Sequence, residues 1–159
     1  MANFDLDSID RLLMTTKAVR RRLDFKRPVP RELVVECVRL ACYAPNASNA
    51  QEWRWMLVDD PKQRERVAEV YREILVPRVS QMLETKRAAG DEAGARISRS
   101  ILYLADHMHE VPVLVIPCVR PRTTDATAAV QASTFGSVFP AAWNYMLAAR
   151  ARSLATVLT

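Results

Sequence analysis

The spacing of hydrophobic residues predicts a chain made mostly of amphipathic helices with a few strands. The first helix is expected to be capped by Asp7 or Ser8 and to carry apolar positions at helical spacing, namely Ile9, Leu12, Leu13 and Thr16. A second helix follows Pro30, which suits a first helical turn, and Glu32 complements the positive end of its dipole. The core-facing side of this helix consists of Leu33, Val34, Cys37, Val38 and Ala41.

Nearly continuous bulky runs predict strands at Trp53–Val58 and at Val111–Val119. A long helical stretch lies between them, and Pro77 is expected to kink or divide it. Its apolar stripe is predicted to be Val67, Val70, Tyr71, Ile74 and Leu75. A further helix repeats apolar side chains at Ile97, Ile101, Leu104, Ala105 and Met108.

The last helical stretch, Ala126–Arg152, is rich in alanine and is expected to break near Gly136 and Pro140. One face carries Val138, Ala141, Ala142, Tyr145, Met146 and Ala149. Because small residues allow helices to approach closely, this face suits a helix between two subunits. It suits a central helix of one monomer nearly as well.

Short uncharged polar side chains gather in the loop Ala44–Trp53, A-P-N-A-S-N-A-Q-E-W, which we call the amide loop. Its amides and hydroxyl offer donors and acceptors without charge, and loops on rigid elements often carry binding groups. Asn and Ser also form turns for purely local reasons. The residues alone leave both interpretations open.

Basic residues are concentrated in the segment that follows the first helix, at Lys17 and Arg20–Arg22. A solvated charge cluster at a helix end is one interpretation, since cations are favourable there. A phosphate clamp is another, because guanidinium groups bind phosphate oxygens in bidentate fashion. Nucleic-acid binding is the weakest interpretation, because the segment contains no alternating aromatic residues.

Composition narrows the classes of function. The chain has 159 residues, of which 50% are hydrophobic and 26% charged, as expected for one globular domain. With only three glycines it holds neither a dinucleotide-binding glycine motif nor a P-loop. Its net charge of +5 favours anionic partners such as a phosphorylated cofactor.

The spacing of Cys37, Cys42 and Cys118 does not suit a metal site, and free thiols in a reducing compartment are expected. His107 and His109 point to different sides of a helix, so no metal site is expected there either. The longest apolar run is too short to cross a bilayer. We therefore expect a cytoplasmic protein.

Three segments resemble the FMN-dependent nitroreductase family. The amide loop is similar to the family motif A-P-S-x-x-N-x-Q-P-W, with Asn46 in place of Ser and Glu52 in place of Pro. Residues 17–21, K-A-V-R-R, resemble the R-R-S-V-R segment that holds the FMN phosphate and ribityl chain. Residues 141–156 resemble A-x-x-N-l-x-L-A-A-x-x-x-G-L-G-T/S, although Ser153 and Ala155 replace glycines.

This resemblance implies an α+β fold with a central, mostly antiparallel sheet flanked by helices. It implies a single domain over residues 1–159, in which residues 63–110 form the variable helical excursion of the family. A homodimer with FMN at its interface is also implied. Relative to family members the chain ends early, in the middle of an apolar strand at Thr159, and the C-terminal part of the fold is expected to be missing.

The implied FMN-binding residues come from the same three segments. They are Lys17, Ala18, Val19, Arg20 and Arg21, then Pro45, Asn46, Ser48, Asn49 and Gln51, and finally Leu154, Ala155 and Thr156. The implied reaction is a two-step hydride transfer through flavin N5, from NAD(P)H to a nitroaromatic, a quinone or a similar acceptor. Because the cofactor carries this chemistry, no general acid or base is expected.

Two alternatives remain. The substituted glycines and the short chain suit a flavin-binding or storage protein with little turnover. The basic character suits an interaction module without a cofactor. Neither membrane association nor nucleic-acid binding is expected.

Overall fold

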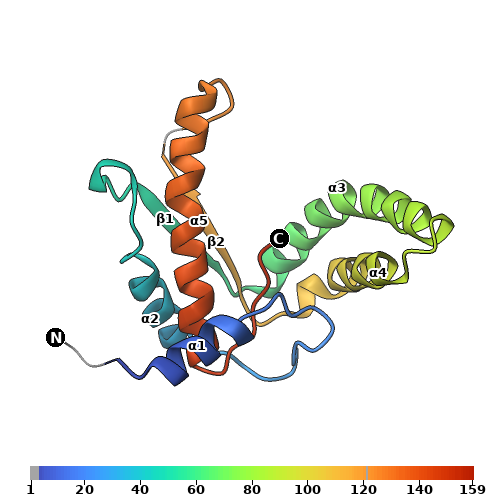
Figure 1. Cartoon of the computed structure of the whole chain (residues 1–159), viewed down its shortest axis with the longest axis horizontal. Helices are drawn as coiled ribbons and strands as arrows, with labels where there is room; N and C mark the ends of the chain where they lie inside the picture. The colour runs from blue at the N-terminus through green and yellow to red at the C-terminus, as the bar shows by residue number, and fades with distance from the viewer. Residues whose placement is uncertain (1–3, 121) are drawn as a thin grey trace. The chain divides into compact units, whose positions relative to one another are not determined.

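The computed structural model describes residues 4–120 and 122–159 of the chain, coloured from one end to the other in Figure 1. The elements along the chain are α1 (Leu6–Thr15), α2 (Arg31–Ala41), η1 (Ala47–Asn49), β1 (Trp53–Val58), α3 (Pro61–Ala88), α4 (Glu92–His107), η2 (Met108–Glu110), β2 (Leu114–Val119) and α5 (Ala128–Ala151). Helices predominate, and the two strands pair with each other. The expected α+β class is therefore confirmed.

The first helix begins earlier than predicted, because its cap is Asp5 and not Asp7 or Ser8. One carboxylate oxygen of Asp5 accepts a hydrogen bond from the Ser8 backbone N–H at 3.3 Å, and the other accepts one from the Ser8 hydroxyl at 2.6 Å. A carboxylate at this position satisfies donors that the first helical turn leaves without partners. Ser8 is thus the partner of the cap, one turn inside the helix.

Neither proline divides its helix. The break predicted in α5 is therefore wrong, and of the kink or division predicted at Pro77 only the division is excluded. Helix α3 runs unbroken through Pro77, and α5 runs unbroken through Gly136 and Pro140. A proline removes one backbone hydrogen bond, but burial of side chains on both sides can hold the helix together. Val138 and Ala141, which flank Pro140, are both buried.

The chain divides into two compact units. The first contains the residues up to Ala18, Val29–Met56 and Val115–Thr159. In it, α5 packs against α2, α1 and η1. The predicted apolar face of α5 is confirmed, since every residue named for it from Val138 to Ala149 is buried. On α2, the side chains of Val34, Cys37 and Ala41 are buried.

The second unit contains Val19–Pro28 and Leu57–Leu114, and its α3 packs against α4 and η2. Leu104, Ala105 and Met108 are buried here as predicted, together with Ala68, Val79 and Leu83 of α3. Ile97, which was predicted for the same face of α4, is exposed. Val70 and Ile74 are exposed instead of buried. The stripe predicted for α3 is therefore wrong at these two positions, whereas Val67, Tyr71 and Leu75 are half-buried.

The two strands run antiparallel, with the start of β1 beside the end of β2. The Arg120 backbone N–H, just after β2, donates a hydrogen bond to the Glu52 carbonyl oxygen, just before β1, at 3.4 Å. This pairing fixes the point at which the amide loop ends and the sheet begins.

No helix in the described residues combines the length and the apolar character that a bilayer span requires.

Candidate functional site

The amide loop has an unusual backbone. Ser48, Asn49 and Gln51 have φ values of 54°, 51° and 47°, in the left-handed region that favours glycine. Each such residue costs about 1–2 kcal/mol relative to the ordinary helical region, although Asn tolerates it better than most. Strained residues of this kind concentrate at ligand-binding sites when the surrounding structure holds them in place.

Hydrogen bonds within the loop support this conformation. The Asn46 side-chain oxygen accepts from the Gln51 backbone N–H at 2.8 Å, which closes the loop over five residues. The Gln51 amide nitrogen donates to the Asn49 side-chain oxygen at 3.2 Å. Ser48, Asn49 and Gln51 are exposed, whereas Asn46 is half-buried. The loop therefore exposes uncharged hydrogen-bond donors and acceptors to the solvent, and its own hydrogen bonds hold the backbone that carries them.

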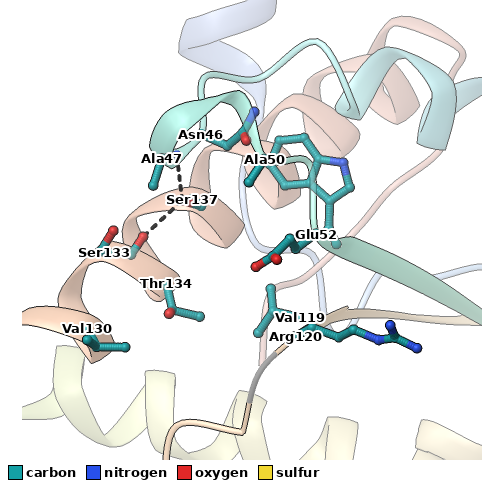
Figure 2. A pocket seen from close by; sticks show the side chains of 11 residues that line it. Asn46, Ala47, Ala50, Glu52, Val119, Arg120, Val130, Ser133, Thr134 and Ser137 are labelled. Carbon is teal, nitrogen blue, oxygen red and sulfur yellow. Dashed lines mark hydrogen bonds between the residues drawn. The ribbon is translucent and has the colours of Figure 1, made fainter. Parts of the chain in front are cut away.

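Helix α5 and strand β1 anchor the loop. The Ser137 hydroxyl accepts a hydrogen bond from the Ala47 backbone N–H at 3.1 Å, as the dashed lines in Figure 2 show. At the loop ends, Ala44 and Trp53 are buried in one cluster with Ala141. The loop is thus fixed by apolar packing at both ends and by a polar contact near its middle.

A cavity of about 230 Å³ lies beside the loop. It is lined by Asn46, Ala47, Ala50, Glu52, Trp53, Val119, Arg120, Val130, Ser133, Thr134 and Ser137. Figure 2 shows the Glu52 carboxylate directed toward Thr134, and the Arg120 guanidinium directed away from the cavity. A carboxylate, several hydroxyls and apolar walls form a mixed surface that suits a small polar or aromatic molecule.

The basic segment is divided between the two units. In the first unit, Ala18 forms an isolated parallel bridge with Thr156, which brings Lys17 and Ala18 beside the predicted C-terminal site residues. In the second unit, the guanidinium carbon of Arg21 lies 5.8 Å from the centre of the Tyr103 ring. Such a stack holds a guanidinium through its face and leaves its N–H groups able to bind an anion.

Ser153 has a φ of 60° and closes helix α5. The Leu154 N–H donates to the Ala149 carbonyl at 2.9 Å, and the Ser153 N–H donates to the Arg150 carbonyl at 3.1 Å. This pair of bonds is a Schellman cap, in which glycine is the usual left-handed residue. Ser153 therefore takes a conformation that favours the glycine expected at this position.

The predicted site residues of the first unit form two separate groups. The amide loop contacts α5 at Ser137, whereas Leu154, Ala155 and Thr156 follow its last turn. At 1.5 Å per residue, Ser137 and Ser153 lie about 24 Å apart along the helix. One copy of the chain therefore does not bring the amide loop and the segment after α5 together.

Burial keeps the ionisable side chains beneath the site in their neutral forms. Burial raises the pKa of the Tyr145 phenol and the pKa of the Cys37 thiol above their ordinary values. Tyr145 also lies 5.9 Å, between ring centres, from Trp55. Neither group supplies a proton donor or a nucleophile poised near neutral pH.

Sequence reasoning missed Ser137 and Glu52 as possible site residues. Ser137 lies 90 positions after Ala47, so no local pattern connects the two. Glu52 attracted attention only as a departure from the family motif. The available signal was its place directly before a strand, because residues at strand ends often line cavities.

Comparisons with known proteins agree with this fold. A family model described as "Nitroreductase family" matches residues 14–159. No curated protein matches the chain. Among solved structures, one similar chain is a nitroreductase-like family protein from Bacillus cereus, at 17% identity and a TM-score of 0.59. That match covers 96% of this chain and 68% of the other.

Two further structures are more similar in sequence. The FMN-dependent nitroreductase NfnB from Mycobacterium smegmatis, in complex with NADPH, is 22% identical with a TM-score of 0.60, over 94% of this chain and 73% of that one. An iodotyrosine deiodinase bound to FMN and 3-iodo-L-tyrosine is 23% identical with a TM-score of 0.64, over 95% and 73%. The likeness confirms the expected fold, and with the match to the family model it places this chain in the nitroreductase family.

Proposed function

We propose that this chain is an FMN-dependent NAD(P)H oxidoreductase that reduces nitroaromatics, quinones or similar acceptors. The observation that supports this most strongly is the family match over residues 14–159, which includes the amide loop and its left-handed backbone. Related folds have been solved as an FMN-dependent nitroreductase with NADPH and as a deiodinase with FMN. We propose that this chain binds the same two ligands, FMN and NAD(P)H.

The amide loop fits the polar part of a flavin. The flavin ring system and the ribityl chain offer hydrogen-bond donors and acceptors without charge, and Asn46, Ser48 and Asn49 match them in kind. Gln51 supports Asn49 through the hydrogen bond between their side chains. Pro45, directly before Asn46, restricts the entry of the chain into the loop.

The basic segment fits the phosphate. Among the described residues, the cations of Lys17, Arg20 and Arg21 form no ion pair with a carboxylate. Free cations of this kind can accept a phosphate without first giving up a partner. Within the first unit, the bridge between Ala18 and Thr156 places the backbone of residues 154–156 beside Lys17 and Ala18, and we propose that this backbone binds the ribityl chain.

A complete site requires a second copy of the chain in this proposal. The amide loop and the segment after α5 are about 24 Å apart along one helix, so each copy would provide one half of each site. Helix α5 also exposes Phe135, Phe139 and Trp143, which are spaced four residues apart on one side. An exposed apolar stripe of this kind is typical of a surface covered by another chain. We therefore propose a homodimer.

FMN, when bound, would supply the redox chemistry, which is hydride transfer between NAD(P)H and the acceptor. The protein binds and orients. Lys17, Arg20 and Arg21 would hold the phosphate, while the amide loop would hold the polar edge of the ring or the ribityl chain. No side chain of this chain is assigned proton transfer.

A flavin-binding or storage protein with little turnover is the second candidate. The observation that favours it is the pair Ser153 and Ala155, which add side chains where the family has glycine. Ser153 uses its left-handed backbone to close α5, but its Cβ occupies space that a glycine would leave open. A basic module without cofactor rests only on the net charge of +5.

Spectroscopy of the purified protein tests the three candidates. The proposed enzyme is expected to carry flavin absorbance, to bleach when NADPH is added without oxygen, and to recover its colour when a quinone is added. A storage protein would be coloured but would not cycle. Colourless protein that binds DNA with strong salt dependence would point to the basic module.

The phosphate clamp makes a sharper prediction. Arg20→Gln with Arg21→Gln should weaken FMN binding by about 100- to 10,000-fold, because each charge-assisted hydrogen bond contributes about 1.5–3 kcal/mol and the double variant loses one from each arginine. Binding of riboflavin, which has no phosphate, should change little. Arg78→Gln on α3 is the matched control for loss of a surface arginine. Equal losses for FMN and riboflavin would place the two arginines elsewhere in the site.

A further inference from the structure

We infer that Ser137 is a positioning residue that holds the amide loop in its left-handed conformation from helix α5. The inference concerns how the loop is held, and its consequence for FMN rests on the proposed function. The contact joins residues 90 positions apart, so it ties a local loop to the long helix of the first unit.

Both hydrogen-bonding roles of the Ser137 hydroxyl are used. The hydroxyl donates to the Ser133 carbonyl oxygen at 2.9 Å, as a serine within a helix often does. It accepts from the Ala47 N–H at 3.1 Å. Because the first bond fixes the direction of the hydroxyl hydrogen, a lone pair is directed to the loop (Figure 2).

The hydrogen bond from Ser137 reaches the loop directly before its left-handed residues. Ala47 directly precedes Ser48 and Asn49, the first two left-handed residues of the loop. The other bonds to this turn run between Asn46, Ala47, Asn49, Ala50 and Gln51, so they close the loop on itself. The bond to Ser137 is different, because it fixes the closed turn to a helix.

Packing does not substitute for this bond. The buried cluster of Ala44, Trp53 and Ala141 fixes the two ends of the loop. Residues 47–51 are exposed and have no comparable burial. Loss of the Ser137 hydroxyl should therefore release the middle of the loop while its ends stay in place. The side chains of Ser48 and Asn49 would then lose their fixed positions.

The direct test is amide hydrogen exchange at Ala47 in the full chain, measured by NMR. Ser137→Ala should speed this exchange by about fivefold to tenfold, which is the usual effect of losing one neutral hydrogen bond. Ser133→Ala is the matched control, because Ser137 uses only the backbone carbonyl of Ser133. This control should leave exchange at Ala47 at the wild-type rate.

Cofactor binding gives a second readout. Ser137→Ala should weaken FMN binding by about fivefold while the melting temperature stays close to that of the wild type, and Ser137→Thr, which keeps a hydroxyl, should restore binding. A general structural role would lower the melting temperature in step with affinity, and Thr would not rescue it.

The two readouts separate two kinds of failure. If the wild-type protein binds no FMN, the proposed function fails, and exchange at Ala47 still decides the role of Ser137. If exchange at Ala47 is the same in Ser137→Ala and Ser133→Ala, the positioning role is overturned whether or not FMN binds. If exchange speeds up but FMN affinity is unchanged, the inference that the position of the loop matters to the cofactor is overturned.

Discussion

The two halves of helix α5 differ sharply. All seven of its buried residues lie between Val138 and Ala149, where the helix forms the centre of the first unit. Among the described residues of its first half, 128–137, none is buried. That half lines the cavity and carries the contact to the amide loop. One helix thus combines a core segment and a segment that supports a site.

Residues with a left-handed backbone conformation lie next to each half of α5, and they have different roles. At the core end, the conformation of Ser153 allows two backbone hydrogen bonds that close the helix. At the other end, Ser48, Asn49 and Gln51 lie in a loop that side-chain hydrogen bonds close, from Gln51 to Asn46 and from Gln51 to Asn49. The left-handed conformation of Ser153 is explained by the closure of α5. The left-handed residues of the amide loop close no long helix, and we propose that they serve a binding site.

Removing the apolar anchor between the loop and the core half should have the largest effect. Trp53 is 6% exposed and packs in one cluster with Ala44 and Ala141. Trp53→Ala should lower the free energy of unfolding by about 3–5 kcal/mol, measured by chemical denaturation. Tyr43→Ala, at a residue 85% exposed, should change it by less than about 0.5 kcal/mol. Similar losses in both variants would contradict the anchoring role of Trp53.

Glycine substitutions compare the two kinds of strain directly. Ser153→Gly and Ser48→Gly should each raise the free energy of unfolding by about 0.5–1 kcal/mol. The reason is that removing a left-handed cost of about 1–2 kcal/mol outweighs the extra entropy that glycine loses on folding. Thermal denaturation measures the gain.

The same two variants should differ in cofactor binding. Ser48→Gly removes a proposed flavin contact, so its FMN affinity should fall while its stability rises. Ser153→Gly should keep or improve FMN affinity, because it restores the residue usual in the family. If both variants change affinity equally, the distinction between architectural and functional strain is wrong.

The smallest expected effect concerns pH and the core end of α5. The Arg152 guanidinium donates to a Glu36 carboxylate oxygen at 2.7 Å, and this bond lowers the pKa of Glu36 below its ordinary value of 4.5. A lowered pKa in the folded state stabilises the fold above the ordinary pKa. That contribution is lost as the pH falls through the lowered value.

We therefore expect Glu36→Gln to be slightly less stable than the wild type at neutral pH and equally stable in strongly acid solution. Denaturation curves across this range measure the difference. Because the Glu36 side chain is 52% exposed, solvent screening keeps the effect small. A gap between the two proteins that grows toward acid pH would have the wrong sign for this ion pair.

Patterns local in sequence predicted much of the fold. The buried face of α5, the burial of Cys37 and the strand at Trp53–Val58 follow from spacing and residue type. The continuity of α3 and α5 through their prolines could not be predicted that way, because it depends on packing on either side. The exposure of Ile74 likewise depends on which side of α3 faces α4.

Less of the candidate site than of the fold could be predicted from the sequence. The resemblance located the amide loop, but the left-handed backbone at Gln51 has no signal in residue type. The cap formed by Ser153 was hidden because serine stands where glycine is usual. The hydrogen bond between Ser137 and Ala47 joins residues that are 90 positions apart in the sequence, so it could be identified only from the structure.

Pro140 has a consequence for how this protein responds to heat. Pro140 has no backbone N–H to donate to the Gly136 carbonyl oxygen, so α5 lacks one backbone hydrogen bond in the turn that contains Ser137. Fraying that starts at Thr127 can therefore stop at this gap and leave the buried half of the helix intact. The amide loop would then come free in a molecule that is otherwise folded. Warming should abolish ligand binding at a lower temperature than the one at which the core melts.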